Sequence, residues 1–168
     1  MKAKVSIIMG STSDLPVMEK AAKILDQLQI PFEINALSAH RTPEEVEKFS
    51  KEAEPRGLEV IIAAAGMAAH LPGVIASMTN LPVIGVPVKA SLEGLDSLLA
   101  IVQMPPGIPV ATVGINAAQN AGILAAQIIA RKDAEVNKNL AEFKNSLKNK
   151  IIKANDELKK VKYEFKVN

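Results

Sequence analysis

The residues of this 168-residue chain best suited to chemistry are its two histidines, His40 and His70, each in a loop after an apolar run. Imidazole can take and give a proton near neutral pH. His40 is followed by Arg41, whose charged fork suits phosphate, and Ser38 adds a donor on the same loop. A structural, hydrogen-bonded histidine is the alternative, but the neighbouring arginine favours chemistry. We therefore predict that His40 is a general acid and base beside an anion.

A second polar loop, residues 10–14, reads Gly-Ser-Thr-Ser-Asp and leads into a helical pattern. The hydroxyls of Ser11 and Ser13 and the free amides of a helix N-terminus suit a phosphate. Asp14 would repel phosphate, but its carboxylate can accept two hydrogen bonds from a ribose diol. The alternative is that Ser13 or Asp14 only caps the helix. Phosphate and ribose sites side by side indicate a nucleotide.

A third loop, residues 66–73, has few polar side chains. Its small residues let the backbone amides of Gly66 to Ala69 approach a carboxylate or carbon dioxide. His70 is either a second proton relay or a buried histidine that orients the loop, and the sequence slightly favours the second interpretation. Ala68 and Leu71 belong to the same candidate wall.

Other chemistries lack their motifs. The absence of cysteine excludes disulfides and thiolate metal sites. The two histidines and Asp14 include no pair at the helical i, i+4 spacing of a metal site. No nucleophile elbow, Walker loop or dinucleotide glycine motif follows an apolar run, which argues against hydrolase, ATPase and dinucleotide-binding functions.

The elements that must position these loops alternate between strand and helix patterns, as in βαβ units. Continuously apolar runs are typical of parallel strands covered on both faces. We therefore predict a three-layer α/β/α domain with a parallel five-stranded sheet and its site at the carboxyl ends of the strands. The expected strands are 5–9, 32–37, 60–65, 82–88 and 110–115.

The helical patterns have clear ends. The first stops before Pro31, and Thr42, Pro43 and Glu45 predict a capping box that opens the second, which gives Thr42 a structural role. The last 35 or so residues predict a long amphipathic helix, with the apolar positions 136, 140, 143, 147, 151, 154, 158 and 161. We expect a catalytic domain over 1–131 and a helical extension over 132–168. Because this helix is long for the domain, we expect it to pack on a neighbouring subunit; folding back or fraying is the alternative.

Charge is distributed unevenly along the chain. Residues 60–130 carry only Lys89, Glu93 and Asp96, whereas residues 131–168 carry 11 basic and 6 acidic side chains. A basic tail with few aromatic residues differs from the basic stripe of a nucleic-acid-binding protein. Pro and Gly interrupt the charge-free runs, which argues against membrane spans. We expect a cytoplasmic protein with neither nucleic-acid nor membrane partners.

Four segments together resemble the PurE family of purine biosynthesis: MGSTSD at 9–14, SAHRTP at 38–43, AAHLPGV at 68–74 and GLDSLLAIVQMPPGIPVATV at 94–113. The resemblance covers residues 5 to about 131. It implies a flavodoxin-like fold, a homo-octamer and no cofactor or metal. It also implies an N5-carboxyaminoimidazole ribonucleotide mutase, which moves a carboxylate from an exocyclic nitrogen to ring carbon C4.

The resemblance also implies residue roles. His40 corresponds to the general acid and base, Gly66 to Leu71 to the wall around the carboxylate, and the remaining polar set to ribonucleotide binding: Ser11, Ser13, Asp14, Ser38 and Arg41. Two features depart from many relatives: Met67 stands where Gly is frequent, and the loops 89–93 and 116–120 are shorter. The alternatives are a direct carboxylase that uses carbon dioxide and a non-catalytic flavodoxin-like module that binds flavin or nucleotide.

Overall fold

The computed structural model describes residues 2–168. Its centre is a five-stranded sheet in the order β2-β1-β3-β4-β5, in which every pairing is parallel. This is the flavodoxin-like order. The strands are β1 Val5–Met9, β2 Phe32–Ala36, β3 Val60–Ala65, β4 Val83–Pro87 and β5 Ala111–Thr112.

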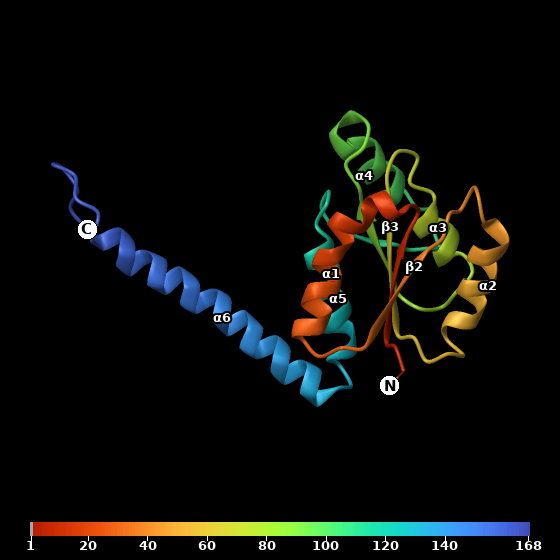
Figure 1. Cartoon of the computed structure of the whole chain (residues 1–168), viewed down its shortest axis with the longest axis horizontal. Helices are drawn as coiled ribbons and strands as arrows, with labels where there is room; N and C mark the ends of the chain where they lie inside the picture. Colours follow the sequence, from red (N-terminus) through yellow and green to blue (C-terminus); the bar gives the residue numbers. More distant parts are fainter. Residues whose placement is uncertain (1) are drawn as a thin grey trace.

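Helices cover both faces of the sheet (Figure 1). The α-helices are α1 Leu15–Gln27, α2 Pro43–Ala53, α3 Leu71–Ala76, α4 Leu95–Val102, α5 Ala118–Ile129 and α6 Ala134–Lys159, and two short 3-10 turns, η1 Thr12–Asp14 and η2 Leu92–Gly94, precede α1 and α4. The predicted α/β/α architecture is confirmed.

Two apolar clusters explain the layers. Alternate side chains of β1 point to opposite faces: Ile7 joins the cluster of α1 and α5, and Ile8 joins that of α2 and α3. All residues of β1, β3 and β4 are buried, which accounts for their almost entirely apolar sequence, with Ser6 as the polar exception. The close fit of α5 on α1 requires Gly122, because a Cβ there would lie 2.4 Å from the side chain of Ile24.

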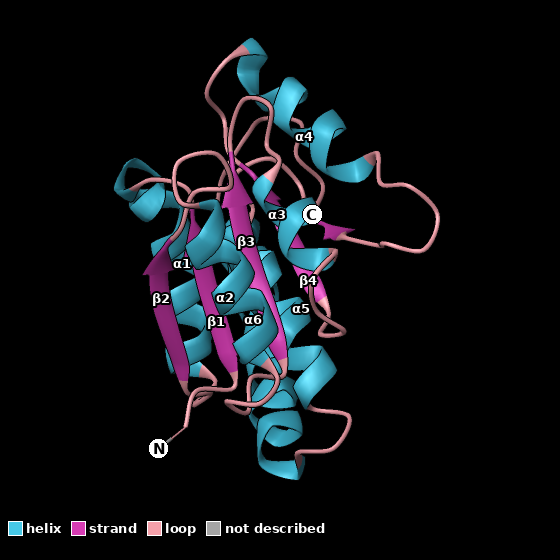
Figure 2. Ribbon diagram, turned by 90° about the vertical axis from the view of Figure 1, so that its right-hand side faces the viewer, coloured by secondary structure: helices cyan, strands magenta, loops and turns pink. Residues whose placement is uncertain are grey.

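The carboxyl ends of the strands meet at one edge of the sheet, near α4 (Figure 2). The chain passes from β1 to β2 on one side and continues with β3 on the other side of β1. Ligand sites of open parallel sheets lie at such reversals of strand order. The fold therefore directs the loops after β1, β2 and β3 to one place.

Two local predictions need correction. The fifth strand was expected over 110–115, but only Ala111–Thr112 pairs with β4. Pro43 does open α2, yet the Thr42 side chain does not cap that helix. The Thr42 hydroxyl instead accepts a hydrogen bond from the Ser38 amide and donates one to the Ser38 carbonyl, at 3.0 and 3.2 Å. The Thr42 side chain therefore stabilises the loop between Ser38 and Thr42 and does not cap α2.

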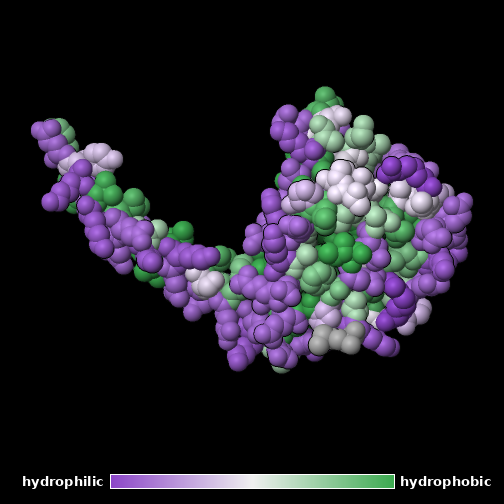
Figure 3. All heavy atoms as spheres, in the orientation of Figure 1, coloured by the Kyte–Doolittle hydropathy of each residue, from purple (hydrophilic) through white to green (hydrophobic). Residues whose placement is uncertain are grey.

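The helix α6 extends away from the body of the molecule (Figure 1). Only its first half contributes buried apolar residues, Val136, Leu140 and Phe143. Hydrophobic atoms recur along the projecting half (Figure 3), where Leu147, Ile151 and Leu158 are exposed. The predicted amphipathic helix is present: its first half packs on its own domain, and its second half does not fold back. Among residues 2–168, none of the helices combines the length and apolar character needed to cross a membrane.

Candidate active site

A cavity of about 740 Å³ opens at the carboxyl edge of the sheet. It is lined by the loops that follow β1, β2, β3 and β4. The ten residues singled out from the sequence all lie on its wall: Ser11, Ser13, Asp14, Ser38, His40, Arg41, Gly66, Ala68, His70 and Leu71. The structure thus brings the three predicted loops into one site.

The loop after β1 uses Ser11, not Ser13 or Asp14, as its cap. The Ser11 hydroxyl accepts hydrogen bonds from the Ser13 amide at 3.3 Å and from the Ser13 hydroxyl at 3.0 Å. The Asp14 side chain makes no capping bond to α1. The alternative in which the side chain of Ser13 or Asp14 serves only as a helix cap is therefore wrong. Asp14 lies on the cavity wall, and its carboxylate makes no capping hydrogen bond to α1.

Asp14 is held in an environment that disfavours its charge. Burial raises the pKa of the Asp14 carboxyl above its usual range, and hydrogen bonds from Ser11 and Ser13 offset only part of this effect. A partly buried carboxylate on a cavity wall gains from hydroxyl donors on a ligand. A ribose diol provides two such donors.

Arg41 links the loop after β2 to the loop after β1. Its Nη2 donates to the Gly10 carbonyl at 2.7 Å, and its Nε donates to the Ser38 hydroxyl at 3.3 Å. A guanidinium group has five N–H donors. These two bonds orient the group, and its other N–H donors make no further hydrogen bond within residues 2–168. The arrangement suits an anion such as phosphate.

The two histidines are in direct contact. His40 Nε2 lies 2.8 Å from His70 Nδ1, and the rings meet edge to face with centroids 4.9 Å apart. At this distance one nitrogen donates a hydrogen bond and the other accepts it, and the tautomers of the two rings decide which. Both rings are exposed to the cavity. The expectation of a buried His70 is therefore wrong: His70 meets His40 at the surface of the site.

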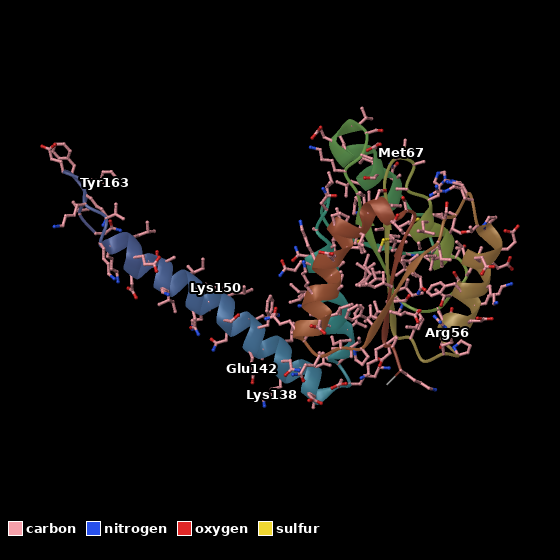
Figure 4. The ribbon with its side chains drawn as sticks, in the orientation of Figure 1. Arg56, Met67, Lys138, Glu142, Lys150 and Tyr163 are labelled. Atoms are coloured by element: carbon pink, nitrogen blue, oxygen red, sulfur yellow. The ribbon has the colours of Figure 1, made fainter. Side chains whose placement is uncertain are left out.

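The loop after β3 is a strained turn of small residues. Met67 and Ala69 have φ values of 57° and 47°, a left-handed conformation that L-residues seldom adopt. The Ala69 amide donates to the Gly66 carbonyl at 3.0 Å and closes the turn. The Met67 side chain is 62% exposed and projects near α4 (Figure 4). Such strain concentrates at ligand sites.

The fourth wall of the cavity was not predicted. Val88, Lys89 and Ala90 follow β4 and line the same space. One signal was available: Lys89 is one of only three charged residues between positions 60 and 130. Within residues 2–168, no group of three His, Cys, Asp or Glu side chains is arranged to hold a metal ion.

The fold and the cavity together define a flavodoxin-like protein with a nucleotide-type site that contains a paired imidazole. Comparison with known proteins gives the family. The model of the AIR carboxylase family matches residues 4–150. The chain therefore belongs to the AIR carboxylase, or PurE, family, as its sequence motifs indicated.

Three similar proteins illustrate the relationship. The N5-carboxyaminoimidazole ribonucleotide mutase of Thermotoga maritima is 55% identical over 98% of this chain and 97% of its own length. The phosphoribosylaminoimidazole carboxylase of Candida glabrata is 52% identical over 97% of this chain, which corresponds to 29% of that longer protein. The crystal structure of Treponema denticola PurE superposes with a TM-score of 0.83 at 33% identity, over 93% of this chain and 98% of that one.

Proposed function

We propose that this protein is an N5-carboxyaminoimidazole ribonucleotide mutase of purine biosynthesis. The Thermotoga maritima relative, similar over nearly the full length of both chains, bears that name. The observation that carries the chemistry is the contact of 2.8 Å between His40 Nε2 and His70 Nδ1 on the wall of the cavity. The reaction needs one proton to be given and one to be taken, and this pair can do both.

The reaction divides into two balanced steps. First, the bond between the exocyclic nitrogen and the carboxylate carbon breaks, carbon dioxide leaves, and the nitrogen takes a proton from His40. Second, ring carbon C4 attacks carbon dioxide, a carbon–carbon bond forms, and the C4 proton passes to His40. The proton is thus returned to the enzyme, and His70 is placed to hold it between the steps.

The other loops have roles in binding and containment. Arg41 and the serines Ser11, Ser13 and Ser38 bind the phosphate, and Asp14 binds the ribose hydroxyls. The backbone of the loop from Gly66 to Leu71 holds carbon dioxide against an apolar surface. No metal or cofactor takes part in this scheme.

The direct test is incubation of the purified protein with the carbamate substrate, N5-carboxyaminoimidazole ribonucleotide, with and without bicarbonate. We expect conversion to 4-carboxy-5-aminoimidazole ribonucleotide at a rate that bicarbonate does not change. Strict dependence on bicarbonate would instead identify a carboxylase, the name borne by the Candida glabrata relative. A yellow protein that releases flavin on denaturation would support a binding module.

The proposal includes the assembly and its location. We infer that residues 1–131 form the catalytic unit and that, within the extension 132–168, the part of α6 beyond Phe143 packs on neighbouring copies in a homo-octamer. Two exposed apolar stripes support this inference: one on α6, and one on η2 and α4 that consists of Leu92, Leu95, Leu99 and Val102. We place the enzyme in the cytoplasm because its proposed substrate is phosphorylated and cannot cross a membrane unaided.

A further inference from the structure

Lys89 is a cation of the cavity that the proposed mechanism does not yet use. It follows β4, whereas Arg41 follows β2. Since the strand order is β2-β1-β3-β4, these two cations come from opposite ends of the row of loops that lines the cavity. The proposed substrate also has two separate anionic groups, a phosphate and a carboxylate. Arg41 accounts for one of them.

The loop after β4 lies directly against the loop after β3. A Cβ placed on Gly66 would be 3.3 Å from the Ala90 Cβ and 3.4 Å from the Val88 carbonyl oxygen. Lys89 stands between these two residues. It is therefore beside the loop that holds the carboxylate in transfer, and one strand further from the phosphate-binding loops.

The Lys89 backbone is fixed, but its ammonium group is not firmly held. The Lys89 amide donates to the Asn116 Oδ1 at 3.0 Å. The ammonium forms an ion pair with Glu93, in which the two side chains are 49% and 83% exposed. An exposed pair of this kind contributes little stability, so a ligand anion in the cavity can replace Glu93.

Glu93 lies on an unusual turn. Leu92, Glu93 and Gly94 have φ values of 41°, 58° and 87°, three consecutive left-handed residues of which only one is glycine. Backbone strain of this kind is typical of ligand-binding and switching segments. A weak contact with a strained turn thus holds the Lys89 ammonium group.

We propose that Lys89 exchanges Glu93 for the carboxylate group of the substrate and steadies that carboxylate as it moves from nitrogen to C4. This role rests on the proposed mutase function. Lys89 takes no part in proton transfer: it forms and breaks only an ion pair, while the proton of the reaction passes through His40. The residue therefore determines specificity for the carboxylated nucleotide.

The test compares two variants that break the same ion pair, Lys89→Gln and Glu93→Gln. If Lys89 binds substrate, Lys89→Gln raises KM about tenfold or more, because a charged hydrogen bond is lost. Glu93→Gln releases Lys89 and leaves KM unchanged or lower. If Lys89 only secures the turn, both variants raise KM by the same factor, and that result would overturn the proposal. Lys89→Arg, which keeps the charge, is expected to stay within a fewfold of wild type.

A binding measurement identifies which anion Lys89 contacts. We expect Lys89→Gln to weaken binding of the product, 4-carboxy-5-aminoimidazole ribonucleotide, about tenfold or more, and to leave binding of aminoimidazole ribonucleotide within about twofold. Equal weakening of both ligands would indicate a phosphate contact and overturn the proposal.

Wild-type protein assayed in parallel separates the two hypotheses. Absence of conversion by wild type would contradict the mutase function itself. Wild-type turnover combined with the same KM change in both variants would contradict only the role of Lys89. Unchanged melting temperatures show that the variants are folded, as expected for two exposed side chains.

Discussion

The contact between His40 and His70 couples two loops that lie thirty residues apart in the chain. A proton held between two imidazoles can move toward either ring without leaving the site. This arrangement suits a reaction in which the enzyme gives a proton in one step and recovers it in the next. We therefore propose that the chemistry depends on this pair rather than on a lone histidine.

Replacement of His40 should abolish the proton transfers. We expect His40→Asn to reduce turnover at least about a hundredfold, the usual contribution of general acid and base catalysis. His70→Asn keeps a polar group at the relay position and should cost less, about tenfold. Steady-state rates with the carbamate substrate provide the measurement. A His40→Asn enzyme that retained more than about a hundredth of wild-type turnover would contradict the assignment.

We expect the charged Asp14 carboxylate to lower the stability of the folded protein and to strengthen substrate binding. Because burial raises the pKa of this carboxyl in the folded protein, the folded state holds the proton more tightly than the unfolded state. Ionisation of Asp14 therefore lowers the free energy of unfolding as the pH rises above 3.8, the ordinary pKa of an aspartate carboxyl. We expect Asp14→Asn to be more stable than wild type near about pH 7, with a difference that shrinks toward about pH 4.

The same variant should bind substrate poorly, since an amide accepts hydrogen bonds from ribose hydroxyls less strongly than a carboxylate does. We expect KM to rise about tenfold or more. Denaturant unfolding across the pH range and steady-state kinetics measure the two effects. A variant less stable than wild type at neutral pH would show that Asp14 has a structural role.

Much of the site could be predicted at residue scale because parallel strands end at one edge of the sheet. Ser11, His40 and Gly66 follow three different strands, and the fold brings their loops together. Lys89 was missed because one lysine after a strand is ordinary on protein surfaces. The contact of His40 with His70 was missed because it depends on the conformations of two loops. In the loop after β3 that conformation is set by two left-handed residues, Met67 and Ala69.

At the scale of elements, the strands β1 to β4 were predicted well and β5 poorly. The short runs of almost entirely apolar residues in β1 and β3 favour strands that are covered on both faces. The segment 110–115 is also largely apolar, yet only Ala111 and Thr112 pair with β4, whereas β2, the strand at the other edge, pairs over five residues. Apolar sequence predicts a strand, but the sheet around it decides how much of the strand pairs.

The start of α6 is fixed by Asp133. Its side chain accepts hydrogen bonds from the amides of Glu135 and Val136, at 3.1 Å each, and lies 2.6 Å from the ammonium group of Lys4. The hydrogen bond from Lys4 is the main reason why the pKa of Asp133 is lowered. This residue therefore joins the beginning of α6 to the sheet.

We expect Asp133→Ala to lower the melting temperature by about 2–4 °C at neutral pH, as for loss of a helix cap. Because the folded-state pKa of Asp133 is depressed, its contribution is complete above its ordinary value of 3.8 and is lost as pH falls below it. The difference in melting temperature between Asp133→Ala and wild type should therefore become smaller at acidic pH. Asp156→Ala, which removes an exposed ion pair with Lys159 in the same helix, is the control and should change little. Equal effects of the two substitutions would contradict a special role for Asp133.

At the scale of the whole molecule, α6 has one buried and one exposed half. Its charged side is exposed to solvent, as for Lys138 and Glu142, which pair along the helix (Figure 4). Its apolar stripe continues past the body of the domain through Leu147, Ile151 and Leu158, all exposed. The segment 144–159 is about 24 Å long at about 1.5 Å per residue. An apolar stripe of this length without a partner within its own chain is typical of a subunit interface.

Substitution of Ile151, which is 66% exposed in the single chain, tests this interface. If the stripe packs on another copy, Ile151→Glu places a charge in an apolar contact and should dissociate the proposed octamer into smaller species at micromolar concentration. Asn149→Glu introduces the same charge on the opposite face of α6 and should leave the mass unchanged. Light scattering after size exclusion measures both masses. A wild-type protein that remains monomeric at these concentrations would contradict the assembly, whereas dissociation by both variants would indicate general repulsion between acidic helices rather than a contact through the apolar stripe.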